Sequence, residues 1–423
     1  MAKPKLALIP AAQGTKLYSV LPSDGTGDFT FTRGSVGTRI NAQGLIENVA
    51  SGQSRLDYPL IDGVQKGCPH HILEPARTNV VQYSKDFTQL SSQSNVTISL
   101  NQIISPEGSL NASSFIDNSA SGVHRAFTVY SSSIASGQLV SHSIFAKAKE
   151  HKWFQLSTGG NTNDQWANFD LENGIIGNSS SSANPIIENY GNGWYRCILF
   201  ATTSANNASL AGLVTLTNNL DATSRSPSYS GSNKGVYVFG LQIEQGSYAT
   251  SYIPTNGESG GVTRSAETAS GAGNSTTFND SEGCLMAEIS ALADDGTFRA
   301  IAVSDGGDAN RVVIDYDTSN GIRAFYAIGG GTLGRFFTID YDIKLNAKIC
   351  FKYKVNDFAV WVNGFELGSS NSGSVLSGGN FNNLNFNFGS SSGGEFYGNT
   401  KQVQYFDSAL ADTQLEQLTS WQS

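Results

Sequence analysis

From residue 97 onward, the chain is a series of short segments in which apolar or β-branched residues alternate with polar ones. Each segment is closed by Gly, Asn or Ser, which is typical of strands separated by turns. The clearest examples are residues 124–130, 140–148, 152–158 and 235–244, and polar loops are expected at 178–185 and 223–235. Strands with no helical stretch between them bury their apolar faces by stacking two sheets, which predicts a β-sandwich.

A second sandwich is expected after a break at residues 255–280. Within residues 347–370, apolar residues alternate up to a turn at Asn356 and Asp357, and again up to Asn363 and Gly364. Asn-Gly between two such runs is a strong signal for a two-residue hairpin. This pattern predicts a meander of three antiparallel strands.

The end of the chain has a helical pattern instead. Thr413 and Glu416 have the spacing of a capping box, and Leu415, Leu418 and Trp421 recur on one helical face. The expected fold class is therefore all-β, with two antiparallel β-sandwiches and one short C-terminal helix.

Composition narrows the setting of the protein. Charged residues make up only 14% of the chain, against about 25% in typical globular proteins, and the net charge is −9 without a basic run. The chain has no basic run that could release counterions from a nucleic acid, so no nucleic-acid partner is expected. The sequence has no apolar run of about 18 residues, so membrane insertion is not expected either.

The N-terminal segment lacks the sustained apolar region of a secretory signal. The four cysteines are far apart in sequence and show no metal-ligand spacing, which predicts reduced thiols. Both features indicate synthesis in a cytoplasm, whereas the Ser-, Asn- and Gly-rich composition is typical of an extracellular β-adhesin. A particle assembled inside a cell and released by lysis reconciles the two.

Several ordered segments then carry a family resemblance. Residues 31–63 and 72–87, followed by the segments FDLENG, NGWYRC, GLQIEQGSYATSYIPT and VTRSAE, resemble a family of tailed-bacteriophage virion proteins. In that family a Glu-Pro-x-Arg-Thr-Asn element leads into a jelly roll like a carbohydrate-binding module, which closes with Ser-Tyr-Ile-Pro-Thr. The resemblance spans roughly residues 29–268. Through VWVNGFEL and the terminal helix, the C-terminal part is similar to concanavalin-like and laminin-G-like sandwiches.

The resemblance implies a division of the chain into an N-terminal anchor (1–30), a turn-rich linking segment (31–80), the jelly roll (81–256) and the C-terminal sandwich (257–423). It implies a virion protein whose N-terminal segment contacts other virion proteins and whose chains form a homotrimer. The expected function is a fibre or receptor-binding appendage that recognises host-surface glycans. One alternative is a capsid or tail decoration protein that contacts only virion proteins; another is a polysaccharide-degrading enzyme.

The segment LEPARTN has the residues of a structural brace between domains. Pro75 removes a backbone donor and biases Glu74 toward an extended backbone, while Arg77 offers five donors and Asn79 can bond its own backbone. We predict that Glu74, Arg77 and Asn79 form this brace, with a receptor contact as the alternative for Glu74 and Arg77. The paired Thr-Arg elements at 32–33 and 263–264 flank the jelly roll, and we expect them to lie near each other.

Sugar binding would depend on aromatic side chains that stack on apolar sugar faces beside amides and carboxylates. One hairpin-like region supplies this set, with Trp153, Asn163, Asp164, Trp166 and Asn168 as the candidate carbohydrate-binding residues. The alternative is that these aromatic side chains belong to the core, as is expected for Trp194, which follows a Gly-Asn-Gly turn.

Catalytic residues are not expected. The acidic pairs 294/295, 315/317 and 340/342 include two with strand spacing, but exposed acids on a half-buried strand have the same pattern. Asp305, Asp308 and Asn310 lie on a glycine-rich loop and could ligate Ca²⁺, with a glycine turn carrying solvated acids as the alternative. No other cofactor is expected.

Overall fold

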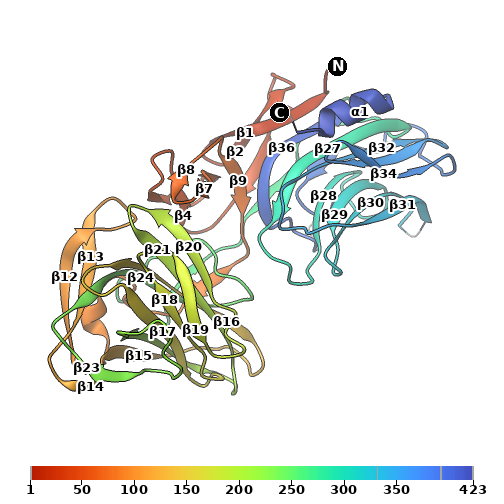
Figure 1. The fold of residues 1–423 in the computed structure, drawn as a ribbon. Coiled ribbons are helices and arrows are strands. Elements are labelled where there is room, and N and C mark those ends of the chain that lie inside the picture. Colours follow the sequence, from red (N-terminus) through yellow and green to blue (C-terminus); the bar gives the residue numbers. More distant parts are fainter. Residues whose placement is uncertain (1, 331, 391–392, 422–423) are drawn as a thin grey trace.

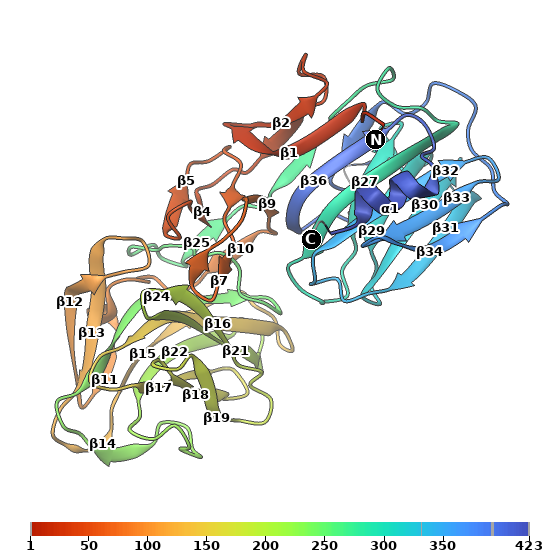
Figure 2. The same cartoon turned by 45° about the horizontal axis from the view of Figure 1, so that its top comes forward.

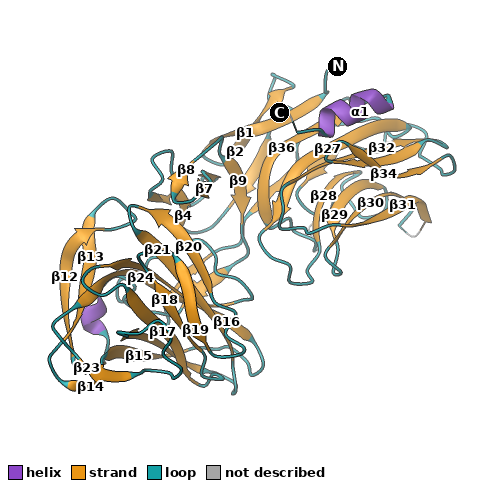
Figure 3. Ribbon diagram, viewed as in Figure 1, coloured by secondary structure: helices purple, strands orange, loops and turns teal. Residues whose placement is uncertain are grey.

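The computed structural model describes residues 2–330, 332–390 and 393–421, which form two β lobes joined by a smaller β-rich segment (Figure 1). The expected all-β class with two antiparallel sandwiches and one short C-terminal α-helix is confirmed (Figure 3). No helix among the described residues is long and apolar enough to cross a membrane. All four cysteines are free; Cys68 is exposed and the other three are buried.

The first lobe is a jelly roll of two packed six-stranded sheets. In spatial order, one sheet contains β11 (Ser92–Ser94), β15 (Arg125–Ser131), β22 (Ser209–Leu216), β17 (Trp153–Gly160), β18 (Trp166–Asp170) and β19 (Ile175–Ser179). The other contains β12 (Val96–Ile104), β13 (Leu110–Asp117), β24 (Gly235–Gln245), β16 (Leu139–Ala148), β21 (Trp194–Thr202) and β20 (Ile186–Gly191). The short strands β14 (Ser121–Val123) and β23 (Ser228–Ser230) pair with each other, and a 3-10 turn, η1 (Phe87–Gln89), precedes β11. The four sequence segments expected as strands correspond to β15, β16, β17 and β24 to within two residues.

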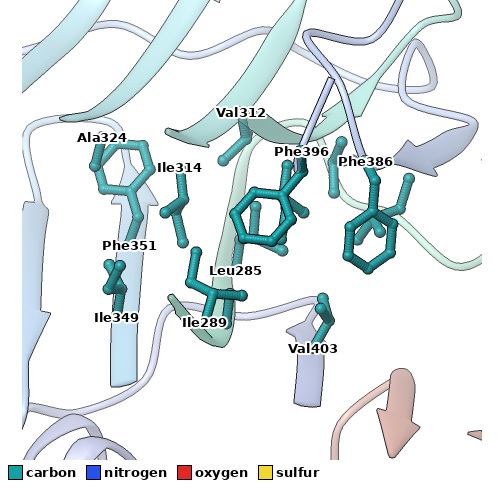
Figure 4. Close-up of a cluster of buried hydrophobic side chains, with 14 of the residues drawn as sticks. Leu285, Ile289, Val312, Ile314, Ala324, Ile349, Phe351, Phe386, Phe396 and Val403 are labelled. Atoms are coloured by element: carbon teal, nitrogen blue, oxygen red, sulfur yellow. The ribbon is translucent and has the colours of Figure 1, made fainter. Parts of the chain in front are cut away.

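The second lobe stacks a five-stranded sheet on part of an eleven-stranded one. The five strands are β31 (Thr332–Asp340), β30 (Gly321–Ile328), β29 (Arg311–Tyr316), β28 (Arg299–Ser304) and β35 (Asn383–Asn385). Facing them are β36 (Gly398–Phe406), β27 (Glu282–Ala291), β32 (Ala347–Lys354), β33 (Phe358–Val362) and β34 (Phe365–Ser370). Figure 4 shows the core between the sheets, where Leu285, Ile289 and Phe351 from one sheet meet Val312 and Ile314 from the other.

The expected three-strand meander is confirmed as β32, β33 and β34. Asn363 and Gly364 have φ values of 51° and 91° and close the two-residue hairpin between β33 and β34. Two consecutive positive φ values match the twist of the flanking strands, which is why Asn-Gly occurs there.

The first strands of the chain belong to the C-terminal lobe. β1 (Leu6–Gln13) pairs with β36, and β2 (Lys16–Leu21) follows it in the same large sheet (Figure 2). β3 (Phe29–Thr32) and β26 (Thr268–Ser270) continue this sheet outward. Leu6, Leu8 and Leu17 have no exposed surface and join the C-terminal core. The strands within residues 2–30 thus belong to the large sheet of the second sandwich, although residues 1–30 were expected as a separate anchor. Contact of this segment with other virion proteins stays a prediction.

The linking segment connects both lobes through short strands: β4 (Gly37–Ile40), β5 (Ile46–Val49), β6 (Leu56–Asp57), β7 (Leu60–Ile61), β8 (Val64–Gln65), β9 (His70–Leu73) and β10 (Arg77–Asn79). β9 pairs with β36 of the large sheet, and β10 pairs with β25 (Val262–Arg264), which follows the jelly roll. The chain therefore enters and leaves the jelly roll through adjacent strands. β3 also pairs with β26, and beside that pair the Ser265 N–H donates to Ser35 Oγ at 2.8 Å, so the two Thr-Arg elements lie near each other as predicted.

The C-terminal helix α1 (Asp412–Thr419) packs Leu415 and Leu418 on the outer face of β32 and β33. Trp421, expected on the same helical face, lies beyond the end of the helix and is 48% exposed, with its ring 4.8 Å from Lys348 Nζ. The expected capping box at Thr413 and Glu416 is wrong. The helix begins earlier, with Ala411 as the N-cap, and the Gln414 side chain accepts a hydrogen bond from the Ala411 backbone N–H at 3.2 Å.

Candidate functional site

Five charged residues are buried together where the two lobes meet. Each side of the junction contributes to this group, and no member is more than 2% exposed. We call it the junction brace; its members are Arg33, Arg55, Glu74, Arg264 and Glu267. All five belong to the segments that carry the family resemblance. Buried charges are retained only where ion pairs and hydrogen bonds offset the loss of hydration, so their contacts determine whether this group can hold the junction.

Glu267 lies at the centre of the brace. One carboxylate oxygen accepts from Arg33 Nη1 at 2.6 Å and from Arg55 Nε at 2.8 Å. The other pairs with Arg55 Nη2 and accepts from the Glu74 backbone N–H at 2.9 Å. Glu267 therefore connects the chain entering the brace from β3 with the strand that leads into the jelly roll.

Glu74 connects the remaining members. Its carboxylate pairs with Arg55 at 2.8 Å and Arg264 at 3.0 Å, and it accepts from the backbone and hydroxyl of Ser251 at 2.8 and 2.6 Å. Burial opposes its ionisation, but the two arginines and the Ser251 donors outweigh that effect and lower the pKa of Glu74 to about 2. The carboxylate is thus ionised over the whole physiological range.

The other two predicted brace residues have different roles. Asn79 is fully buried, and its side chain donates to the Ile253 carbonyl at 2.9 Å while accepting from the Ile243 N–H at 3.0 Å. Arg77 lies outside the ion network, with its guanidinium 5.4 Å from the centroid of the Tyr248 ring. Sequence reasoning missed Arg55 and Glu267, although both are charged residues inside the motif segments and could have been singled out on that ground.

The candidate sugar-binding residues lie on the outer face of the β17–β18 hairpin. Trp153 and Trp166 are half-buried and share a face with Asn168, since alternate strand residues point the same way. Residues 217–227 cross this face, because Asn168 Nδ2 donates to the Leu220 and Ala222 carbonyls, both at 2.9 Å. The fully buried Asn168 is therefore used to hold a loop.

The remaining predicted residues of this face are engaged by the protein itself. Asn163 is exposed and accepts from the Thr202 N–H at 2.9 Å, and Asp164 is exposed and lies 3.6 Å from Arg225. Trp194, expected in the core, is 2% exposed and donates from Nε1 to the Ile104 carbonyl at 3.1 Å. The hairpin does bring Trp153 and Trp166 to one face, but the loop separates that face from open solvent in part.

Asn168→Ala should detach the loop across this face and lower the free energy of unfolding by about 1–2 kcal/mol, because two half-buried carbonyls lose their donor. Urea unfolding measures the change, and limited proteolysis within residues 217–227 should become faster. Asn178→Ala is the matched control, since Asn178 donates to the same loop at Asp221 from an exposed position. Equal effects of the two substitutions would contradict the assigned role of Asn168.

A polar cleft of about 730 Å³ lies at the junction, on a side that sequence reasoning did not identify. The linking segment, the β20 and β21 strands and the C-terminal sandwich all line it, through Asp57, Tyr58, Glu188, Tyr190, Tyr195 and Asn399. No local pattern indicated it, because its walls come from three separate parts of the chain.

Two carboxylates in the cleft have altered acidity. Burial raises the pKa of Asp57 to about 6, although the Ile40 N–H donates to it at 2.7 Å. The surrounding walls of the cleft desolvate Glu188 and raise its pKa as well, and the charge of Arg196 opposes this. His70 lies 3.5 Å from Asp57, but burial lowers the pKa of His70 to about 4, so it is neutral at pH 7. The cleft thus presents carboxylates without an adjoining imidazolium.

The acidic pair 315/317 and the candidate Ca²⁺ loop are held by protein contacts. Asp315 makes a two-pronged ion pair with Arg323, and Asp317 accepts from the Ser319 and Gly321 N–H groups. Of the candidate metal ligands, Asp305 accepts from Asn310 at 2.7 Å and Asp308 pairs with Arg311 at 3.1 Å. The described residues contain no group of three His, Cys, Asp or Glu side chains that could hold a metal ion.

Comparison with known proteins adds little to this geometry. No protein-family model matches the chain, and no curated protein matches it significantly. Among solved structures, the CBM40 of a Ruminococcus gnavus IT-sialidase bound to α2,3-sialyllactose is similar at 12% identity and a TM-score of 0.30, over 36% of this chain and 88% of that one. At that level the likeness carries no argument about ligand or function.

Proposed function

We propose that this protein is a virion appendage of a tailed bacteriophage and that it binds glycans on the host surface. The observation that carries the proposal is the junction brace. The sequence segments that resemble the phage family are distant along the chain, yet their charged residues form one buried ion network. One buried network that joins all of these segments supports the resemblance better than the separate motifs do.

The brace also suits the proposed task. Because both chain crossings into the jelly roll pass through the same network, the jelly roll is held in a fixed orientation on the C-terminal sandwich. An appendage that presents a binding module to a surface gains affinity when the module is preorganised, since less freedom is lost on binding.

The N-terminal strands are the proposed site of contact with other virion proteins. Ile9, Tyr18 and Val20 on β1 and β2 are 51%, 40% and 51% exposed, although Leu8 and Leu17 on the opposite face are fully buried. Exposed apolar side chains grouped on one hairpin are typical of a protein contact. Trimerisation would bury further surface of this kind.

The test is direct binding of the purified, fluorescently labelled protein to a panel of bacterial strains. We expect binding to a subset of strains, loss of binding after mild periodate oxidation of cell-surface sugars, and slower adsorption of the phage to those strains. Binding to phage particles but to no cell would support the decoration role instead. Release of reducing ends from the bound polysaccharide would support the enzymatic one.

A further inference from the structure

We infer that the junction cleft is the glycan-binding site and that it takes a sugar without an acidic group, either neutral or amino-substituted. The inference rests on the proposed function and adds a location and a ligand class to it. The cleft volume of about 730 Å³ is within the range of small-ligand pockets, about 300–1,000 Å³.

The floor of the cleft carries polar groups that have no protein partner. Glu188 accepts no hydrogen bond and forms no ion pair with any residue that the structure describes, although it is exposed to the cleft. The hydroxyls of Tyr58 and Tyr195 likewise bond to no described residue. Free acceptors and hydroxyls beside aromatic rings suit a sugar, which offers hydroxyl groups at its edge and an apolar face to a ring.

The charge of the cleft determines the ligand class. Asp57, Asp62 and Glu188 line it, whereas no Lys or Arg in the described part of the chain does. Arg196 is the strand partner of Glu188, but it is buried behind the floor, where it donates to Ser143 and Thr250. A carboxylate or sulfate on a sugar would therefore meet like charge, while a hydroxyl or ammonium group would find acceptors.

The shape of the cleft is held by close packing. The hairpin of β7 and β8 touches the β20–β21 turn at Gly63 and Gly191, where a Cβ on Gly191 would lie 2.3 Å from the Gly63 carbonyl oxygen. Beside it, the Tyr195 ring lies against Gly174, where a Cβ would approach Cε1 to 2.6 Å. With the junction brace behind them, these contacts leave the cleft preformed rather than dependent on closure.

The experiment uses full-length protein and the surface polysaccharide extracted from cells that the wild type binds, divided by anion exchange into acidic and non-acidic fractions. We expect binding to the non-acidic fraction alone. Glu188→Gln should weaken it about tenfold, because an amide replaces a charged acceptor, and Tyr195→Phe about fivefold, because a hydroxyl is lost. Both changes are nearly isosteric, so thermal unfolding should be unaltered.

Glu172→Gln is the matched control, since Glu172 is an exposed jelly-roll carboxylate whose side chain pairs with Lys152 at the surface. Exclusive binding of the acidic fraction would overturn the ligand class. Wild-type affinity in both cleft variants, with loss in Trp153→Ala or Trp166→Ala, would place the site on the outer sheet face and overturn the location while leaving the proposed function intact. Failure of the wild type to bind any cell would instead reject the proposed function.

Discussion

Glu267→Gln should lower the free energy of unfolding by about 3–5 kcal/mol, the cost of removing one partner from a buried ion network. The substitution keeps the shape of the side chain but removes the charge that Arg33 and Arg55 share. Only Glu74 would then face three buried guanidinium groups, because Arg264 belongs to the same network. An unpaired buried charge is far more costly than the pair itself was favourable.

Calorimetry is the measurement of choice, because it would resolve separate unfolding transitions of the two sandwiches. We also expect faster proteolysis at the two junction crossings, residues 74–81 and 255–268, because the brace holds both. Glu47→Gln is the control: Glu47 pairs with Arg39 at 3.2 Å, but the two side chains are 42% and 26% exposed, so the loss should be below about 1 kcal/mol. A loss of the same size in both variants would show that the network does not hold the junction.

His142→Leu should reduce the loss of stability in acid, because it removes one buried group that takes up a proton only on unfolding. His142 is fully buried in β16 on the same face as Val140 and Ile144, and neither ring nitrogen has a hydrogen-bond partner in the described part of the chain. Burial alone lowers the pKa of His142 from 6.5 to about 3. The imidazole is therefore neutral in the folded protein at pH 7 and remains so in mild acid.

The sign of the pH effect follows from these two pKa values. Between pH 6.5 and pH 3 the unfolded chain binds a proton at this position and the folded chain does not, so stability falls as the pH falls. At pH 4 the loss relative to pH 7 is about 3 kcal/mol from His142 alone. The pKa values of His70, His71 and Glu74 are also lowered, to about 4, 3 and 2, so the decline in His142→Leu should be shallower rather than absent. Urea unfolding at a series of pH values measures it.

Val140→Ala provides the comparison, because it alters the same core without removing a titrating group and should shift stability equally at every pH. Parallel pH profiles for the wild type and His142→Leu would contradict the prediction.

Asp57 affects stability in the opposite direction. Its pKa is raised to about 6 in the folded protein, so it takes up a proton there at a higher pH than in the unfolded chain, and its destabilising effect decreases as the pH falls below 6. The same applies to Asp315, whose pKa is also about 6.

The candidate site was predicted only in part. Glu74 and Asn79 were singled out because LEPARTN has an unusual composition for a strand, and both are fully engaged at the junction. Trp153 and Trp166 were predicted from residue type, and the structure places them on one face. The loop that crosses this face could not be foreseen, because the bonds from Asn168 reach carbonyls more than fifty residues away.

The sequence by itself determined the local features of this protein. Alternation with period two, Gly and Asn turns, and the Asn363–Gly364 hairpin follow from backbone conformations that a few neighbouring residues decide. Only the tertiary structure decided that Leu6 pairs with Tyr405, that Arg55 and Glu267 meet, and that three parts of the chain enclose a cleft. These contacts depend on which strand edges and charged side chains, distant in sequence, are buried together. The pairing that forms leaves the fewest unpaired polar groups in the whole molecule, which no single segment can determine.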